Sequence, residues 1–580
     1  YPETDMIDHI ILVVEIGLMC LITFLSFKYR KYWVSLLSII PTLLIAWFEL
    51  KGPEMETMNH IYVDHLSILM CLIIGFIGGL IIIYAVGYMY GYHNHHKEYA
   101  DRRQYFFALL FIFIGAMFGF VLSSNLLWID LFWEITSVCS FLLIGYTKTE
   151  EAVNNSFRAL WMNLLGGTVL AFGIVYFGCS VGTVSIHDLV LFGNMQNAAA
   201  VIPIACIAFA ALTKAAQMPF STWLMGAMVA PTPSSALLHS ATMVKAGIYI
   251  LLRLAPAMRD TLTGNMVSFV GGFTFFVASI LAISQNDGKR VLAFSTISNL
   301  GLMVACCGVG MPETIWAAVF LMMFHSISKS LLFQTVGAVE NRIGSRDIEN
   351  MHGLLYRLPS LATFMFIGIA GMFLAPFGML ISKWSALKAA VDDGNILLVL
   401  FIAFGSATTG LYWTKWMGKL ISRSHRGSAK TDEITQKSQK LSLRVHAGMM
   451  IMLCVLLPII SQVFVDPLLI EMFGTYTDVL SLPILIIMVV IFLFIFMVPV
   501  VSFTYTRHQE SSVKLSYMSG VNVGNNNQFV NSLGHNNKLW LSNLYFTDFI
   551  RPERTMRLSQ LIASGWILIL FCMILGGTIL

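Results

Sequence analysis

Charged residues are scarce in this sequence: they make up 11% of its 580 residues, whereas 57% are hydrophobic. Soluble globular proteins carry about 25% charged residues, so this composition excludes a soluble domain. Apolar runs of about 18 or more residues recur along the chain, and each is long enough to cross a hydrocarbon core of roughly 30 Å. The sequence therefore predicts a polytopic membrane protein with about sixteen transmembrane helices.

The nine cysteines lack any spacing that could build a cofactor site. They are scattered, nearly all within predicted helices, and only Cys306 and Cys307 are adjacent. This spacing excludes an iron-sulfur, zinc or haem framework and argues against a disulfide scaffold. We therefore predict neither a metal nor a cofactor on this chain, and no redox chemistry of its own. If the protein works in a redox complex, the cofactors lie on partner subunits.

Nucleotide and zinc-protease motifs are also missing. The sequence has no P-loop, no GxGxxG after a strand and no HExxH, which excludes nucleotide-driven pumps and intramembrane zinc proteases. The basic residues do carry information, because they cluster after the odd-numbered predicted helices, while acidic residues follow the even-numbered ones. The positive-inside rule then predicts a multi-pass protein of the cell (cytoplasmic) membrane with cytoplasmic basic loops and both termini outside.

Hydropathy divides the chain into four parts. Residues 1–103 hold three N-terminal helices, 104–254 and 265–419 each hold five, and 420–580 hold the last three. The hydrophilic segment 504–555 contains the Gly/Asn-rich stretch "GVNVGNNNQFVN", a composition that favours turns over regular structure. We predict that this segment is a loop that contacts a neighbour or lies on the membrane surface.

Ionisable residues recur inside the predicted membrane helices. Each costs about 2.5 to 3.5 kcal/mol at the bilayer centre on insertion scales and is therefore a candidate functional residue. They are Glu134, Lys214, His239, Lys245, His325, Lys329 and Lys383. Taken singly, each has a structural explanation: an ion pair that fixes packing, a lysine that snorkels, or a core histidine. Their number in a chain with so few charges favours an ion path.

The spacing of these residues refines the prediction. His325 and Lys329 are four apart, so on a helix they share a face at roughly 6 Å, within reach of one water for proton exchange. His239 and Lys245 are six apart, which places them on different faces and about 9 Å apart along the axis. That second pair either bridges two compartments of a path or belongs to unrelated packing.

Two of the predicted helices are interrupted by proline near a lysine. Pro219 follows Lys214 by five residues, and Pro376 precedes Lys383 by seven. A proline frees a backbone carbonyl, which lipid tolerates only where protein or water satisfies it again. Paired interrupted helices with a central charge are typical of transport proteins built from repeats. A plain kink is the alternative, and the opposite order of Lys and Pro leaves the repeat as a suggestion.

Three long stretches resemble a known family. They are "KAAQMPFSTWLMGAMVAPTPSSALLHSATMVKAGIYILLR" (214–253), "RVLAFSTISNLGLMV" (290–304) and "FHSISKSLLFQTVG" (324–337). They are similar to the antiporter-like subunits shared by complex I, the multisubunit cation/proton antiporters and the membrane-bound energy-converting hydrogenases. The resemblance covers roughly residues 60–420. Within the family, "WEITSVCSFLLIGY" and "IGSRDIENMHGLL" look most like the hydrogenase branch, of the Ech or formate-hydrogenlyase type.

The resemblance implies an all-α fold in which the two middle parts are inverted five-helix repeats, each with one discontinuous helix. It also implies roles for the buried residues: Glu134 is the acidic partner and Lys214 the pumping lysine; Lys245, with His239, is the link toward the centre; His325 and Lys329 lie on the central axis; and Lys383 is the terminal lysine. One departure matters. Trp384 follows Lys383 where the complex I relative has a carboxylate, which puts that exit chemistry in doubt.

The function that the resemblance implies is translocation of H⁺ or Na⁺ by a membrane subunit of a multisubunit redox complex. An energy-converting hydrogenase is the first expectation, with NiFe and iron-sulfur clusters on partner subunits and electron transfer occurring there. The alternatives are a subunit of a multisubunit cation/proton antiporter or of a complex I-type NADH/quinone oxidoreductase. A stand-alone antiporter and a purely structural membrane anchor remain open, and nothing in the sequence suggests nucleic acid binding.

Overall fold

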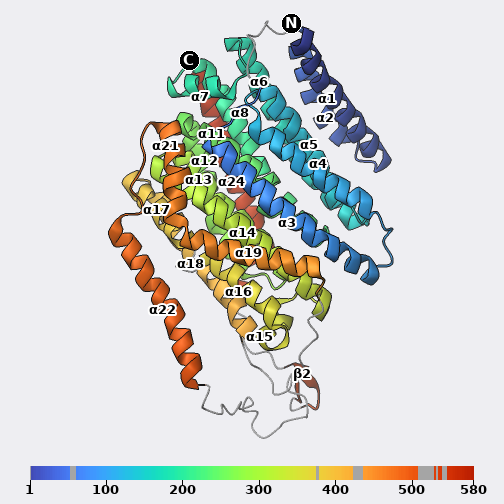
Figure 1. The fold of residues 1–580 in the computed structure, drawn as a ribbon. Helices are drawn as coiled ribbons and strands as arrows, with labels where there is room; N and C mark the ends of the chain where they lie inside the picture. The colour runs from blue at the N-terminus through green and yellow to red at the C-terminus, as the bar shows by residue number, and fades with distance from the viewer. Residues whose placement is uncertain are drawn as a thin grey trace.

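The computed structural model describes residues 2–51, 60–373, 378–421, 435–506, 528–530, 533–538 and 545–579. Within these ranges the chain is helical, apart from one pair of three-residue antiparallel strands. Figure 1 shows long helices lying side by side and tilted in one direction. Twelve described helices are long and apolar enough to cross a membrane, or thirteen if one bent pair counts as a single span. The prediction of an all-α membrane protein is therefore confirmed, but the count of sixteen is not.

The first half of the chain forms the helices α1 (Pro2–Lys28), α2 (Tyr32–Lys51), α3 (His65–His95), α4 (Arg103–Leu122), α5 (Leu126–Ile144), α6 (Glu150–Val181), α7 (Ile186–Asn194), α8 (Ala198–Lys214), α9 (Thr222–Gly226), η1 (Ala227–Val229), α10 (Thr232–Ser240), α11 (Met243–Met258) and α12 (Leu262–Ile283).

The second half forms α13 (Gly288–Val309), α14 (Pro312–Ile343), η2 (Ile348–Met351), α15 (Leu354–Arg357), α16 (Pro359–Phe373), α17 (Met379–Asp392), α18 (Ile396–Ile421), α19 (Lys437–Val455), α20 (Leu457–Ile460), the π-helical turn η4 (Ser461–Val465), α21 (Asp466–Phe473), α22 (Leu482–Thr506), β1 (Gln528–Val530), β2 (Asn536–Lys538), α23 (Thr547–Ile550) and α24 (Pro552–Ile579).

Two regions differ from the sequence predictions. The predicted helix over 443–471 is bent by 74° between α19 and the α20–α21 part. The predicted helix over 234–254 is two helices, because α10 ends at Ser240 and α11 begins at Met243. Most of segment 504–555 lies outside the described residues, so its prediction as a loop stays a prediction.

Side chains at the helix ends fix where several spans begin and stop. Asp64 and Ser67 form a reciprocal capping box at the start of α3, which satisfies backbone donors that the first turn leaves free. Thr149 caps α6, and that helix ends at Gly182 in the left-handed conformation, with φ of 81°. A glycine at this position adopts positive φ without the steric strain that a Cβ brings. The spans are therefore bounded by local sequence as well as by hydropathy.

An ion pair between Asp64 and Arg253 joins two parts of the core that are far apart in the sequence. The guanidinium, on α11, binds the carboxylate at the start of α3 and also donates to the Tyr249 hydroxyl at 2.8 Å. Burial opposes ionisation of Asp64, but the Arg253 guanidinium outweighs burial and holds the pKa of that carboxyl below its usual range. This ion pair fixes α3 against the helix that carries Lys245.

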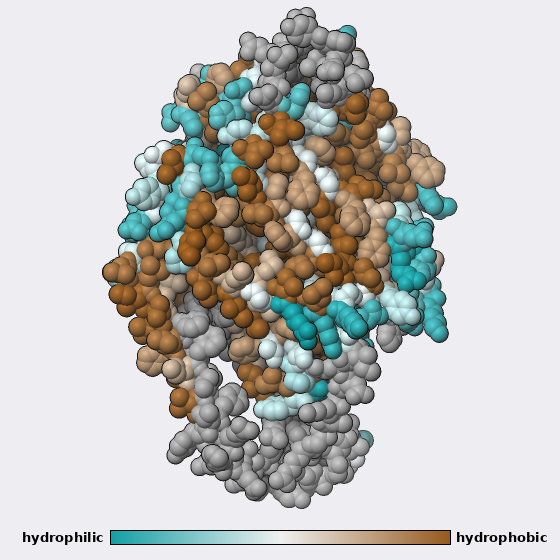
Figure 2. Space-filling view, viewed as in Figure 1, coloured by the Kyte–Doolittle hydropathy of each residue, from teal (hydrophilic) through white to brown (hydrophobic). Residues whose placement is uncertain are grey.

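The outer surface is apolar where a membrane would cover it. Figure 2 shows hydrophobic residues over most of one face and hydrophilic residues gathered in separate patches. In Figure 1, α1, α2 and α22 lie at the outside of the bundle, and the chain starts and finishes at the same end of it. The side of the membrane on which that end lies remains a prediction.

Glycines allow α12 and α13 to pack backbone to backbone. A Cβ placed on Gly271 of α12 would lie 2.4 Å from the Ala305 nitrogen, and one on Gly301 of α13 would lie 2.6 Å from the Gly271 oxygen. Close approach through small residues is the usual way that membrane helices gain packing energy, because lipid supplies no hydrophobic driving force between them. This packing makes α12 and α13 a rigid unit beside the buried lysines.

We predict that Gly301→Ala destabilises the protein by about 1 to 3 kcal/mol, the usual range for overpacking a well-packed core. The new methyl group would meet backbone atoms, which cannot rotate away. Thermal unfolding of the detergent-solubilised protein measures the change. Gly410→Ala in α18 is the matched control, since a Cβ there meets nothing within 4 Å. Equal melting temperatures for the two variants would contradict the packing argument.

Candidate ion-transfer site

The first break in a membrane helix follows Lys214 directly. Helix α8 ends at Lys214, and the next helix begins only at Thr222, with Pro219 in the non-helical stretch between them. Two contacts satisfy backbone groups of the break: the Trp223 indole donates to the Thr213 carbonyl at 2.9 Å, and the Met218 amide donates to the Thr274 hydroxyl at 3.2 Å. The predicted interruption near Lys214 is therefore present, and it is satisfied by protein, as a hydrocarbon environment requires.

Lys214 is fully buried against α5. Its ammonium donates to the Trp133 carbonyl at 2.7 Å and to the Ser137 hydroxyl oxygen at 2.9 Å, and it lies 4.4 Å from the centroid of the Trp133 ring. Glu134 belongs to the same turn of α5, between Trp133 and Ser137 in the sequence, so its carboxylate is the predicted partner that lies next to these acceptors. The two residues are not in ion-pair contact among the described residues, so in this structure the lysine binds neutral oxygens next to its predicted partner.

Two further carboxylates lie close to Glu134, and the sequence analysis missed both. Asp130 precedes Glu134 by one turn of α5, and Glu15 lies on α1; each is 1% exposed. The charges of Asp130 and Glu134 both act on Glu15. Within the described part of the chain, neither oxygen of Glu15 has a hydrogen-bond partner, and the same holds for Oδ1 of Asp130 and Oε2 of Glu134. The four-residue spacing of Asp130 and Glu134 was the available signal, because such residues share a helix face.

A second cluster occupies the centre of the bundle. Lys245 Nζ lies 2.9 Å from His325 Nδ1, which joins α11 to α14. A hydrogen bond between these nitrogens requires that one of them lack a proton and accept. Lys329 lies one turn after His325, and it donates to the Leu292 carbonyl at 3.0 Å and not to His325. The contact of His325 with Lys245 is one that the spacing does not predict, and a shared path for His325 and Lys329 stays a prediction.

His239 completes this cluster from the end of α10. Its ring packs on Phe333 with centroids 4.8 Å apart, and the charge of Lys329 acts on it. Both ring nitrogens are buried without a hydrogen-bond partner among the described residues. The break at Ala241 and Thr242 separates His239 from Lys245, so the six-residue spacing on one continuous helix does not describe their geometry.

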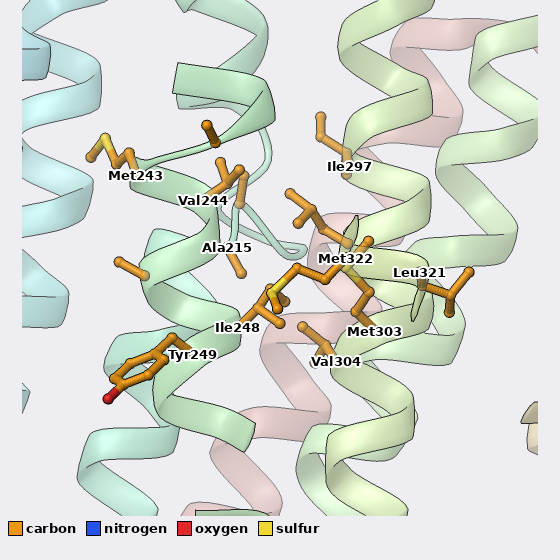
Figure 3. Close-up of a cluster of buried hydrophobic side chains, with 14 of the residues drawn as sticks. Ala215, Met243, Val244, Ile248, Tyr249, Ile297, Met303, Val304, Leu321 and Met322 are labelled. Atoms are coloured by element: carbon orange, nitrogen blue, oxygen red, sulfur yellow. The ribbon is translucent and has the colours of Figure 1, made fainter. Parts of the chain in front are cut away.

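The two clusters are separated by apolar side chains. Figure 3 shows Ala215, Val244 and Ile248 gathered with side chains of α13 and α14. Ala215 directly follows Lys214, and Val244 directly precedes Lys245, whose Nζ lies 3.8 Å from the Met303 sulfur of the same apolar group. A proton passing between the two lysines must therefore pass these apolar side chains.

Lys383 lies near the start of α17 and is 5% exposed. Its Nζ lies 5.8 Å from the centroid of the Phe275 ring on α12. Pro376, predicted to break this span, lies outside the described residues, but α16 ends at Phe373 and α17 begins at Met379 on either side of it. Trp384 stands where the complex I relative has a carboxylate, and its side chain is 43% exposed. It therefore does not occupy the buried position that an exit carboxylate would have.

Comparison with known proteins gives two family matches. The model for "NADH:quinone oxidoreductase/Mrp antiporter, TM" matches residues 123–409, and the model for "NADH-Ubiquinone oxidoreductase (complex I), chain 5 N-terminus" matches residues 47–106. The first match contains all seven predicted site residues. The predicted resemblance to antiporter-like membrane subunits is therefore confirmed at the level of the family.

Individual relatives come from antiporters and from a respiratory complex. The Na⁺/H⁺ antiporter subunit A1 of Staphylococcus haemolyticus (strain JCSC1435) is 32% identical over 485 residues, which are 78% of this chain and 56% of the relative. This chain thus spans about half the length of the curated relatives it matches.

Two solved structures share the fold. The Mrp complex from Dietzia sp. DQ12-45-1b contains a chain that is 25% identical with a TM-score of 0.64, over 87% of this chain and 58% of that one. A chain of an archaeal membrane-bound sulfane sulfur reductase, 20% identical with a TM-score of 0.64 over 80% of this chain and 97% of that one, shows the same fold. The chain therefore belongs to the family of antiporter-type membrane subunits that complex I and the Mrp antiporters share.

Proposed function

We propose that this chain is an ion-translocating subunit of a multisubunit cation/proton antiporter. The observation that carries the proposal is the series of fully buried ionisable side chains, in which Lys214 lies beside Glu134 and Lys245 bonds to His325 at 2.9 Å. Relatives named as Na⁺/H⁺ antiporter subunits support exchange of Na⁺ for H⁺ by the assembled complex. In that exchange, the buried side chains of this chain carry the proton.

The relatives favour the antiporter alternative over the hydrogenase branch predicted from the sequence. Antiporter subunits match at 32% and 33% identity over 66% to 78% of this chain. The sulfane sulfur reductase, a redox complex, is a match of fold alone at 20% identity. The NiFe and iron-sulfur clusters expected on partner subunits belong to the hydrogenase prediction, and they are no part of this proposal.

The proposed mechanism moves Lys214 between two sets of partners. In this structure its ammonium binds Ser137, which shares a helix face with Glu134 three residues before it. Side chains at that spacing are about 5 to 6 Å apart at Cβ, so a change of lysine rotamer brings the ammonium to the carboxylate. Pairing with ionised Glu134 favours the charged lysine, and separation inside a low-dielectric bundle favours the neutral amine and release of the proton.

The energies involved are adequate for ion transport. Moving one charge through a potential of about 150 mV takes roughly 3.5 kcal/mol, at 2.3 kcal/mol per 100 mV. Breaking a buried ion pair by removal of one partner changes the free energy by about 3 to 5 kcal/mol. The free-energy change from a single switch of the Lys214 pairing is therefore of the size that moving one charge against the membrane potential requires.

The extra carboxylates fit a site that exchanges protons. Asp130 and Glu134 are buried near the Lys214 ammonium, and Glu15 is buried on their α1 side. Three ionised carboxylates would leave an uncompensated negative charge among buried side chains, which is strongly unfavourable. We propose that Asp130 and Glu15 share protons with Glu134 and extend the Lys214 site toward α1.

We predict that Lys214→Ala lowers Na⁺-dependent H⁺ exchange in proteoliposomes of the assembled complex by about 100-fold or more, the usual contribution of a proton-transfer group. Lys214→Arg is expected to lower exchange to the same extent, because arginine keeps the charge but does not release its proton. A packing role would tolerate arginine far better than alanine. Lys388→Ala, at an exposed position of α17, is the control and should leave exchange unchanged. Full exchange by the Lys214→Ala complex would overturn the proposal.

We also predict that Lys245 and His325 act as one unit in a double-mutant cycle. Lys245→Met and His325→Asn should each slow exchange, and the double variant should be no slower than the slower single variant, since both remove the same transfer step. Exchange rates at saturating Na⁺ measure the cycle. Additive losses would mean that the 2.9 Å contact has no part in transport.

A further inference from the structure

A cavity of about 380 Å³ lies between the ends of four membrane helices. It is found where α1 ends at Lys28, α4 begins at Arg103, α5 ends at Ile144 and α6 begins at Glu150. Figure 1 shows α1, α4 and α5 toward one edge of the bundle. The walls of the cavity are mostly apolar, and they include Leu25, Tyr29, Tyr105, Phe141, Leu142 and Phe157. None of these residues has a role in the function proposed above.

Three cations surround this cavity, and they come from three separate parts of the chain. Lys28 is the last residue of α1, Arg102 directly precedes α4, and Lys148 lies in the turn between α5 and α6. The charge of Arg102, together with burial and the charge of Lys28, holds the pKa of Lys148 below its usual value. The three positive charges are thus close enough to oppose one another, and an anion in the cavity would stabilise all of them.

The described part of the chain does not neutralise these cations. Among the described residues, no carboxylate lines the cavity or forms an ion pair with any of the three. Asp101, next to Arg102 in the sequence, pairs with Arg103 at 2.7 Å. The Arg102 guanidinium donates to the Tyr146 carbonyl at 2.9 Å, but its Nε has no partner within the same ranges. Guanidinium groups bind phosphate through two parallel N–H bonds, so a phosphate in the cavity would supply the missing acceptor.

Tyrosines place the cavity at the level of the membrane surface. Tyr29, Tyr105 and Tyr146 all line it. Tyrosine is enriched where membrane helices meet lipid headgroups, because its ring is apolar and its hydroxyl is polar. The cations and the tyrosines are therefore at the depth at which a lipid presents its phosphate.

Two apolar strips lead from the cavity toward the middle of the membrane. Tyr105 of α4 is 41% exposed, and Ile112, two turns further along the same face, is 52% exposed. These two residues are about 10 Å apart along the helix axis. On α1, Leu25 lines the cavity, and Leu21, one turn deeper, is 38% exposed. Since α5 packs against both α1 and α4, the two strips border its surface and offer an apolar path to an acyl chain.

We propose that this cavity binds the headgroup of an anionic phospholipid. The phosphate lies among Lys28, Arg102 and Lys148, and the acyl chains follow the exposed strips of α1 and α4. Basic pockets between membrane helices suit anionic headgroups, and here the apolar walls and strips favour a lipid over a free phosphate ion. The inference stands apart from the proposed function, because lipid binding is measured without ion exchange.

Photo-crosslinking in the assembled, detergent-purified complex tests this site. The probe is phosphatidylglycerol with a diazirine on one acyl chain, and mass spectrometry of the digested chain locates the label. We expect label on residues 21–29 and 105–112. Lys28→Gln combined with Lys148→Gln should lower this labelling by about tenfold or more, because each lysine attracts the anionic headgroup. Both side chains are exposed, so their replacement leaves the core intact.

The charge-matched control is Lys97→Gln combined with Lys437→Gln. Both lysines are exposed and neither lines the cavity, so labelling should equal that of the wild-type complex. Full labelling of the Lys28→Gln, Lys148→Gln variant would overturn the site. An equal loss in the control would overturn it too, because it would assign the effect to overall surface charge.

Competition against the probe distinguishes the possible occupants. Unlabelled phosphatidylglycerol should displace the probe, whereas phosphatidylcholine at the same concentration and millimolar inorganic phosphate should not. Equal displacement by phosphatidylcholine would contradict the proposal, since any lipid would then fill the site. Displacement by inorganic phosphate would contradict it as well, because the cavity would then hold a free anion. Absence of label from both segments of the wild-type chain would mean that a neighbouring subunit covers this face, and the proposal would fail.

Discussion

The contact of the Lys214 ammonium with the Trp133 carbonyl and the Ser137 hydroxyl is the interaction on which the proposed site depends. A buried ammonium needs acceptors wherever water is excluded, and here a single turn of α5 supplies them at 2.7 and 2.9 Å. The helix can place a lysine there only because it ends at that residue and the following backbone finds partners in Trp223 and Thr274. The lysine is thereby held beside Glu134 without being locked to it, which leaves the pair free to form and separate.

Much of the fold could be predicted from hydropathy and from Pro219, but not the number of spans. The apolar runs locate the helices because backbone polar groups in lipid must be satisfied within each helix. The predicted span over 234–254 lies within the span Thr232–Met258, but its helix is interrupted between Ser240 and Met243. That break contains neither proline nor glycine, so no local signal marks it, and tertiary packing around α14 sustains it. The inverted-repeat architecture stays a prediction.

Within the candidate site, the sequence identified residues better than it identified their partners. The resemblance pairs Glu134 with Lys214. In the structure, the Lys214 ammonium binds neutral oxygens on the turn of α5 that carries Glu134. The bond between Lys245 and His325 joins two helices 80 residues apart in sequence, and helical spacing carries no information on such contacts. Glu15 lies inside the first predicted helix, but its proximity to Asp130 and Glu134 comes from the packing of α1 against α5, which helical spacing does not reveal.

The central claim is that Glu134 changes its ionisation or its partner as ions cross this subunit. Infrared difference spectroscopy of the assembled complex in proteoliposomes, recorded on addition of a Na⁺ gradient, follows carboxyl and carboxylate bands directly. The account predicts a carboxyl difference band that disappears in Glu134→Gln and is altered in Lys214→Arg. An unchanged difference spectrum in Glu134→Gln, with ion exchange still running, would contradict it.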